Sequence, residues 1–165
     1  MKRASIIFLF MVFSLSVSGY GAAVETVKQQ ALIAIFPLED LRPSEETRGL
    51  GEDMAASLTD GLSAMKDVQV VERRDLKKIM EEIGLGLSGA IDQETAIKVG
   101  KLLGANHLLI GSFMKFRDKV TINARLVRTE TGEITTTSRV KGSFSDLFDL
   151  EEELARNLLS RGLSK

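Results

Sequence analysis

The residue types that most often carry out chemistry are scarce in this chain. Its 165 residues include one histidine and no cysteine. Without cysteine there is no disulfide, no thiolate metal site, no cysteine nucleophile and no cysteine to lipidate. A single histidine argues against multi-histidine zinc sites and weakens any Ser-His-Asp triad. We therefore predict no catalytic, cofactor-binding or metal-binding residues and expect that the protein is not an enzyme.

One glycine motif deserves comparison with nucleotide sites. Gly84, Gly86 and Gly89 match the G-x-G-x-x-G spacing of dinucleotide-binding loops. Such a loop must follow a strand and open a helix, so that backbone amides face the pyrophosphate. Here the glycines follow a predicted helix, and the position twenty residues further on is Leu109 instead of an acid. The motif predicts a helix end followed by a glycine turn.

The remaining candidates favour structural roles. His107 opens a predicted strand, and no G-x-S-x-G motif is present to supply a nucleophile. The glutamates at 81–82 and 151–153 lie on predicted helices, where adjacent side chains point in different directions. The basic residues at 73–74 and 77–78 lack interleaved aromatics, and the net charge is only −1. These patterns indicate solvated helix faces and no nucleic-acid binding.

Hydrophobic periodicity predicts a single α/β domain over residues 31–162. The continuous apolar run at 31–38 is typical of a strand covered on both faces. From Val120 to Leu126 apolar and polar residues alternate, which predicts a sheet with one face in water. The expected strands lie at 31–38, 68–71, 107–116, 120–126 and 134–140, and the expected helices at 50–65, 76–83, 92–103 and 147–158, with a polar loop at 39–48.

The order of these elements predicts the sheet topology. It reads β-α-β-α-α-β-β-β-α, and helices between the early strands favour parallel pairing by right-handed crossovers. Tight turns at 117–119 and 131–132 favour an antiparallel meander at the end. We therefore predict a mixed parallel/antiparallel five-stranded sheet with helices packed on it.

The N-terminus has the features of an export signal. Lys2 and Arg3 precede an apolar run from Ile6 to Val17, and small residues follow up to Ala23. This pattern predicts a cleavable signal peptide over residues 1–23, since a membrane helix needs about 20 apolar residues. Residues 24–30 form a short polar lead. We expect the mature protein to be periplasmic, with association to the outer membrane as a further expectation.

Four motifs together resemble a known family. They are Val70–Arg73 before a helix, Gly84–Gly89, Lys101–Ala105 at a helix end, and Asn123–Val127 in a strand. In this order they resemble the curli-production assembly/transport family (CsgG-like) and the related FlgO-like proteins, over about residues 31–160. The resemblance implies an exported, non-enzymatic protein that serves secretion or the assembly of surface structures at the periplasmic side of the outer membrane.

Two departures from the curli channel members shape the functional prediction. Those members are lipoproteins with extra hairpins that line a pore, whereas this chain has no cysteine and no spare predicted strand. We expect a periplasmic domain that binds envelope or secretion proteins, or further copies of itself, and no small-molecule substrate. One alternative is an activator of a peptidoglycan synthase, because the fold also occurs in lipoprotein activators of penicillin-binding proteins. A second is a small-ligand sensor that uses the glycine turn.

Partner contacts are predicted at two places. Thr135, Thr136 and Thr137 lie in the last strand, which suits the edge of a sheet and could accept a strand from a partner. Pro43 lies in the polar loop 39–48 and stiffens it. If the edge binds a partner, a proline at position 136 is expected to abolish association without disturbing the fold.

Overall fold

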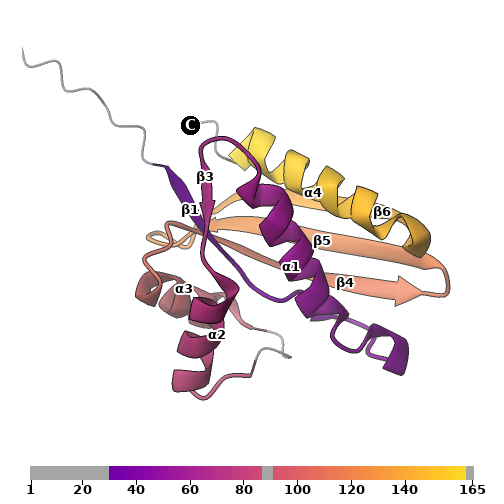
Figure 1. The fold of residues 1–165 in the computed structure, drawn as a ribbon, viewed down its shortest axis with the longest axis horizontal. Coiled ribbons are helices and arrows are strands. Elements are labelled where there is room, and N and C mark those ends of the chain that lie inside the picture. Colours follow the sequence, from indigo (N-terminus) through magenta and orange to yellow (C-terminus); the bar gives the residue numbers. More distant parts are fainter. Residues whose placement is uncertain (1–29, 87–90, 163–165) are drawn as a thin grey trace, which may run out of the picture.

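The computed structural model describes residues 30–86 and 91–162, which form one mixed sheet with helices on both faces (Figure 1). Its strands are β1 (Ala31–Ile35), β2 (Glu39–Asp40), β3 (Val68–Val70), β4 (His107–Phe116), β5 (Lys119–Arg128) and β6 (Ile134–Ser143). Its helices are α1 (Leu50–Ser63), α2 (Arg73–Glu82), α3 (Gln93–Leu102) and α4 (Leu147–Gly162), with short 3-10 helices η1 (Glu45–Thr47) and η2 (Phe144–Asp146). The predicted α/β class and the order of the main elements are confirmed.

The strands lie in the order β3-β1-β4-β5-β6. β1 pairs parallel with β3 and β4, whereas β4, β5 and β6 form an antiparallel meander, as the connections predicted. The sheet has six strands instead of five, because β2 pairs parallel with β4 and places Glu39 beside Ser112. β2 lies in the segment 39–48 that was predicted to be a loop. Two acidic residues carry no hydrophobic pattern, so only the pairing reveals this strand.

The predicted helix ends are also present. The Asp92 carboxylate accepts a hydrogen bond from the Thr95 backbone N–H at 2.9 Å and so caps α3. This bond lowers the pKa of Asp92. Gly84 and Gly104 follow α2 and α3 with φ values of +75° and +67°, a conformation that glycine adopts without steric cost. Gly84 therefore ends a helix, as expected, and does not open one.

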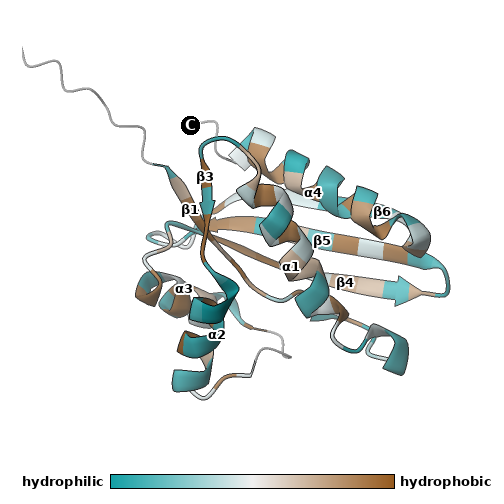
Figure 2. Cartoon of the chain, viewed as in Figure 1, coloured by the Kyte–Doolittle hydropathy of each residue, from teal (hydrophilic) through white to brown (hydrophobic). Residues whose placement is uncertain are grey.

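One face of the sheet is covered by α1 and α4, which lie side by side across it (Figure 1). We call this the covered face. In Figure 2 hydrophobic and hydrophilic positions are mixed along β4 and β5, whereas the visible side of α2 is largely hydrophilic. The largest fully buried side chains of the covered face include Ile33, Met54, Leu58, Leu62, Leu109, Phe113, Ile122, Leu126, Leu154 and Leu158. This cluster is the main hydrophobic core.

The second face is covered only in part. α2 and α3 pack at one end of the sheet, over β1 and the beginning of β4, around a smaller cluster that includes Phe36, Leu108 and Val127. α3 also reaches the turn between β5 and β6, where Gln93 donates a hydrogen bond to the Gly132 carbonyl at 2.9 Å. No described helix covers the remainder of β4, β5 and β6 on this side (Figure 1). The wet face predicted from the alternation in β5 is confirmed.

A buried carboxylate links the two helices of the covered face. The Glu151 side chain in α4 is 4% exposed and accepts a hydrogen bond from the Ser57 hydroxyl in α1. Burial raises the pKa of Glu151, and the nearby carboxylate of Asp53 raises it further, against the effect of the Ser57 bond. The link joins α1 and α4 at the cost of a buried ionisable group.

Candidate functional site

The uncovered part of the second face presents three polar rows of side chains. The register pairs Asn123 with Ser112 on one side and with Arg139 on the other. Because side chains alternate along a strand, every second residue of the three strands faces the same way. We call this surface the open face; it consists of Ser112, Met114, Phe116, Thr121, Asn123, Arg125, Thr137, Arg139 and Lys141.

The open face is basic. Arg125, Arg139 and Lys141 form no ion pair with any described residue. The ion pairs of the described residues lie elsewhere, and most of them are exposed. Arg125 is opposite Thr137, and Arg139 is opposite Asn123, so the two guanidinium side chains are diagonal neighbours across β5 and β6. Diagonal pairs lie about 7–8 Å apart at the backbone. One surface thus gathers like charges that form no ion pair with the described residues.

A groove of about 390 Å³ lies in this surface. Its volume falls within the usual range of ligand pockets, about 300–1,000 Å³. Among the described residues the groove is lined by Pro37, Glu39, Ile91, Ile110, Gly111, Ser112, Asn123, Ala124, Arg125, Thr137, Ser138 and Arg139. Its described lining therefore includes several residues with hydrogen-bond donors and one acidic residue, Glu39.

Arg125 lines the groove and also has a buried donor without a described partner. Its Nε atom is buried and has no partner among the described residues. An unpaired buried donor costs free energy, because it has lost its water without gaining a protein acceptor. The guanidinium group presents donors in a planar fork that matches the two oxygens of a carboxylate. The groove is therefore chemically suited to an anionic group.

An apolar patch lies at the end of the open face, beside the turn between β4 and β5. Phe116 and Met114 are 48% and 41% exposed. The guanidinium groups of Arg42 and Arg117 lie 4.6 and 5.4 Å from the centre of the Phe116 ring, within the range of cation–π contacts. The patch joins exposed apolar side chains to further cations.

The outer edge of the sheet is formed by β6, which pairs with β5 alone among the described strands. The Phe144 N–H donates to the Asp118 carbonyl at 2.6 Å, which fixes the alternation of hydrogen-bonded pairs along this ladder. By that alternation Thr136 bonds toward β5, whereas Thr137, Arg139 and Lys141 direct their backbone groups outward. The free edge predicted for this strand is present.

The three predicted threonines have different surroundings. The Thr136 side chain is 7% exposed and lies on the covered face, against Gly162 at the end of α4. The Thr135 hydroxyl donates to the Leu126 carbonyl at 3.2 Å. Only Thr137 is exposed and also lines the groove. Thr137 is therefore the member of the three whose side chain and backbone are both available.

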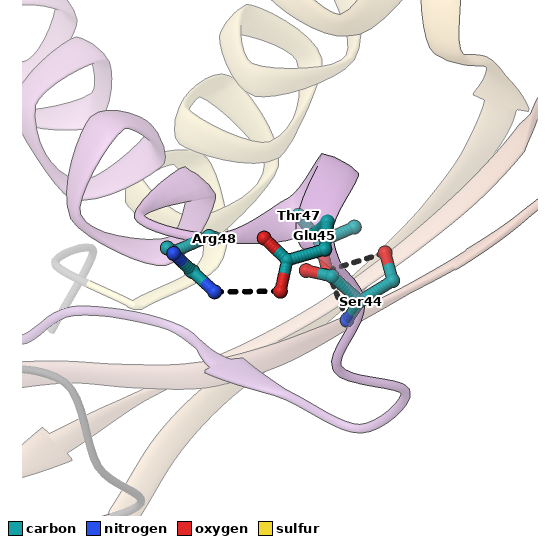
Figure 3. A network of polar contacts seen from close by, with 4 residues as sticks. All are labelled: Ser44, Glu45, Thr47 and Arg48. Carbon is teal, nitrogen blue, oxygen red and sulfur yellow. Dashed lines mark hydrogen bonds and ion pairs between the residues drawn. The ribbon is translucent and has the colours of Figure 1, made fainter.

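Pro43 is exposed and precedes η1, in a loop held by local bonds (Figure 3). The Thr47 hydroxyl accepts a bond from the Ser44 backbone N–H at 2.9 Å, and Arg48 pairs with Glu45 at 2.6 Å. The loop follows β2, which pairs with β4, so β4 and β5 separate it from the β6 edge. The structure does not bring Pro43 and Thr137 together.

His107 lies in a separate shallow groove of about 620 Å³ at the other end of β4 and β5. Its Nδ1 atom is 2.9 Å from the side-chain oxygen of Asn106, and burial together with the nearby Arg128 lowers the pKa of His107. Asn106 itself holds the beginning of β1, since its side-chain oxygen accepts the Leu32 N–H at 2.8 Å. These contacts give His107 a structural setting.

No group of three or more histidine, aspartate or glutamate side chains is placed to hold a metal ion within residues 30–86 and 91–162. No helix in those ranges combines the length and hydrophobicity required to span a bilayer. The predicted signal peptide, most of the polar lead and the last three positions of the glycine motif lie outside the described residues.

Several solved structures share this fold. The LpoB C-terminal domain from Salmonella enterica aligns with a TM-score of 0.57 and 16% identity, covering 72% of this chain and 87% of that one. Lipoprotein GNA1162 from Neisseria meningitidis gives 0.55 and 18% identity, with coverages of 81% and 99%. A PelC dodecamer from Paraburkholderia phytofirmans gives 0.51 and 15% identity, with coverages of 83% and 91%. No curated protein sequence matches the chain.

The fold and the surface define an α/β domain that presents an open basic sheet face and a free strand edge. The family described as "Curli production assembly/transport component CsgG" matches residues 21–119. The chain belongs to this family, so the resemblance seen in its motifs is confirmed.

Proposed function

We propose that this protein is an exported, non-enzymatic component of the cell envelope that serves assembly or secretion at the outer membrane by binding other proteins. Membership of the CsgG family supports this role. The observation that carries the proposal is the ten-residue strand β6, which pairs on one side only among the described strands and borders an open, basic face. A partner strand can add to such an edge through backbone hydrogen bonds.

The export part of the proposal is tested by cell fractionation. The N-terminal pattern predicts removal of residues 1–23 and release of the mature protein into the periplasm. Recovery of a shortened protein in the periplasmic fraction, or with outer membranes, supports the proposal. Recovery of the full-length chain in the cytosol contradicts it.

The edge is tested by a proline at Thr137, because position 136 is unsuitable. A proline at Thr136 removes a donor from the β5–β6 ladder and disturbs the contact with Gly162. At Thr137 it removes an outward N–H and leaves that ladder intact. We expect Thr137→Pro to lose envelope partners in a pull-down, while the matched control Thr137→Val keeps them. Partner recovery by Thr137→Pro at the level of the wild type rejects the edge as the docking site.

A second candidate is the activation of a peptidoglycan synthase by direct binding. The fold shared with the LpoB C-terminal domain favours this alternative. The same pull-down distinguishes the two functions, since secretion or surface-assembly proteins support the first and a peptidoglycan synthase supports the second.

A further inference from the structure

We infer that the groove of the open face is a carboxylate-binding site, and that its occupant is an extended partner segment with aspartate or glutamate at alternate positions. The inference rests on the proposed function and names the chemistry of the partner. It follows from two features of the described residues: cations without an ion pair beside the strand edge, and the polar donors that line the groove.

The first feature is the arrangement of charge. Arg139 and Lys141 lie two positions apart on β6, on the same side of the sheet, and Arg125 lies diagonally across from Arg139. Residues two apart on a strand are separated by about 6.6 Å, which is the spacing of same-side residues on any extended segment. A strand added to β6 with acidic residues at alternate positions therefore places carboxylates beside these cations. Opposite charges in facing positions stabilise such a pair of strands.

The second feature is the set of polar donors that line the groove. Arg125 lines the groove together with the polar residues Ser112, Asn123 and Thr137. A carboxylate that enters the groove accepts a charge-assisted hydrogen bond from the guanidinium group of Arg125. A neutral side chain forms no ion pair there, and a cationic side chain is repelled by Arg125 and Arg139.

Glu39 is the one acidic residue among the described lining residues, and it repels an anionic ligand from its own side of the groove. It lies on β2, beside Ser112, across two strands from Arg139. Its position confines the favourable potential to the β5–β6 side of the groove. This is the side that borders the free edge, so an acidic segment reaches it most directly along β6.

The test is direct binding of synthetic peptides to the purified mature protein. The probes are a labelled peptide of alternating glutamate and valine and two matched peptides in which glutamine or lysine replaces every glutamate. We expect the glutamate peptide to bind at least tenfold more tightly than the others, with an affinity that falls as salt rises. Equal binding of the glutamate and glutamine peptides overturns the inference.

Variants locate the site on the open face. Arg139→Glu and Arg125→Gln are each expected to weaken the glutamate peptide at least tenfold, whereas Arg125→Lys retains part of the affinity because it keeps the charge but not the fork of donors. The matched control is Lys66→Glu, an equal change of charge at an exposed position beside β3, on the other edge of the sheet. An equal loss in the control and in Arg139→Glu contradicts a local site. Unchanged melting temperatures exclude unfolding as the cause.

The same assay separates the inference from its rivals and from the proposed function. The same binding is measured with vesicles that contain phosphatidylglycerol. If the vesicles bind more tightly than the glutamate peptide and Arg139→Glu weakens that binding, the ligand of the open face is a lipid surface and the inferred peptide ligand is wrong. Failure of the proposed function, seen as a cytosolic protein, leaves peptide binding intact. Failure of peptide binding leaves export and edge pairing untouched.

Discussion

The two faces of the same three strands differ in what they bury. On the covered face, β4, β5 and β6 present Phe113, Ile122 and Val140 to α1 and α4. On the open face most of the intervening residues are polar or charged, and the two apolar ones, Met114 and Phe116, remain exposed. Burial of apolar surface is the main source of folding free energy, about 25 cal/mol per Å². The covered face therefore supplies most of the stability, whereas the open face is available for recognition.

The largest expected contrast comes from two phenylalanines of β4 that lie three positions apart on opposite faces. Phe113 is fully buried, so Phe113→Ala is expected to cost about 3–5 kcal/mol of unfolding free energy. Phe116 is 48% exposed, and Phe116→Ala is expected to cost less than about 1 kcal/mol. Urea denaturation of both variants measures the difference. Equal losses would show that the open face also stabilises the fold.

A second contrast tests how closely the helical layer approaches the covered face. A Cβ atom at Gly51, in the first turn of α1, would overlap the Leu38 carbonyl oxygen. Gly51→Ala is therefore expected to destabilise the protein by about 1–3 kcal/mol. Gly61 lies in the same helix with no atom near its Cβ position, so Gly61→Ala is expected to stabilise by about 0.5–1 kcal/mol. Thermal unfolding of the pair checks the opposite signs.

A third prediction concerns the buried carboxylate of the covered face. The pKa of Glu151 is raised in the folded state, so the folded protein binds this proton more tightly than the unfolded chain does. Stability contributed by this group is present at low pH and falls as pH rises from about 4.5 through the raised folded value. Glu151→Gln keeps an acceptor for Ser57 and removes the titration. We expect a gain on the order of 1 kcal/mol at pH 7.

The control for this prediction is the difference between the two proteins as a function of pH. Glu46 has a lowered pKa, because it accepts a bond from Lys115 at 2.6 Å, and Asp92 is lowered by its cap bond. Both act in the opposite direction, since their stabilisation is lost as pH falls. They are common to wild type and variant, so they cancel in the difference. A difference that does not vary with pH contradicts the assignment to Glu151.

The smallest expected effect lies at the apolar end of the open face. Arg42→Gln removes one of the two guanidinium groups near the Phe116 ring, and exposed cation–π contacts contribute about 0.5–1 kcal/mol. Because Arg117 stays beside the ring, we expect a loss below about 0.5 kcal/mol. A larger loss in chemical denaturation would mean that this end of the open face also supports the fold.

The element order was predictable because long strands and amphipathic helices carry strong periodic signals. The alternation of Val120, Ile122 and Ala124 with Thr121, Asn123 and Arg125 predicted one wet face. The Asp92 cap and the Gly84 and Gly104 helix ends were predictable from local geometry alone. β2 was missed, because a two-residue strand is defined by its neighbour β4 and not by its own residues.

The cluster on the open face was not predicted. Arg125 and Arg139 are fourteen positions apart in the sequence, and only the β5–β6 register makes them diagonal neighbours. The cluster could have been predicted from the alternation of side chains along each strand, which shows which residues share a face, combined with the short turn that joins the strands. The same parity distinguishes Thr137 from Thr136, which a run of three threonines does not. Because of the register shift between Leu126 and Val127, counting from the turn pairs the rest of β6 with the wrong residues of β5.

The alternation along β5 has a consequence for how this domain can diverge. From Thr121 to Arg125 every second codon specifies a side chain of the open face, which no described helix covers, while the codons between them specify the core. Substitutions can therefore accumulate at the first set and change what the protein recognises without lowering its resistance to heat. Descendants of one sequence can acquire different ligands while retaining the same folding free energy.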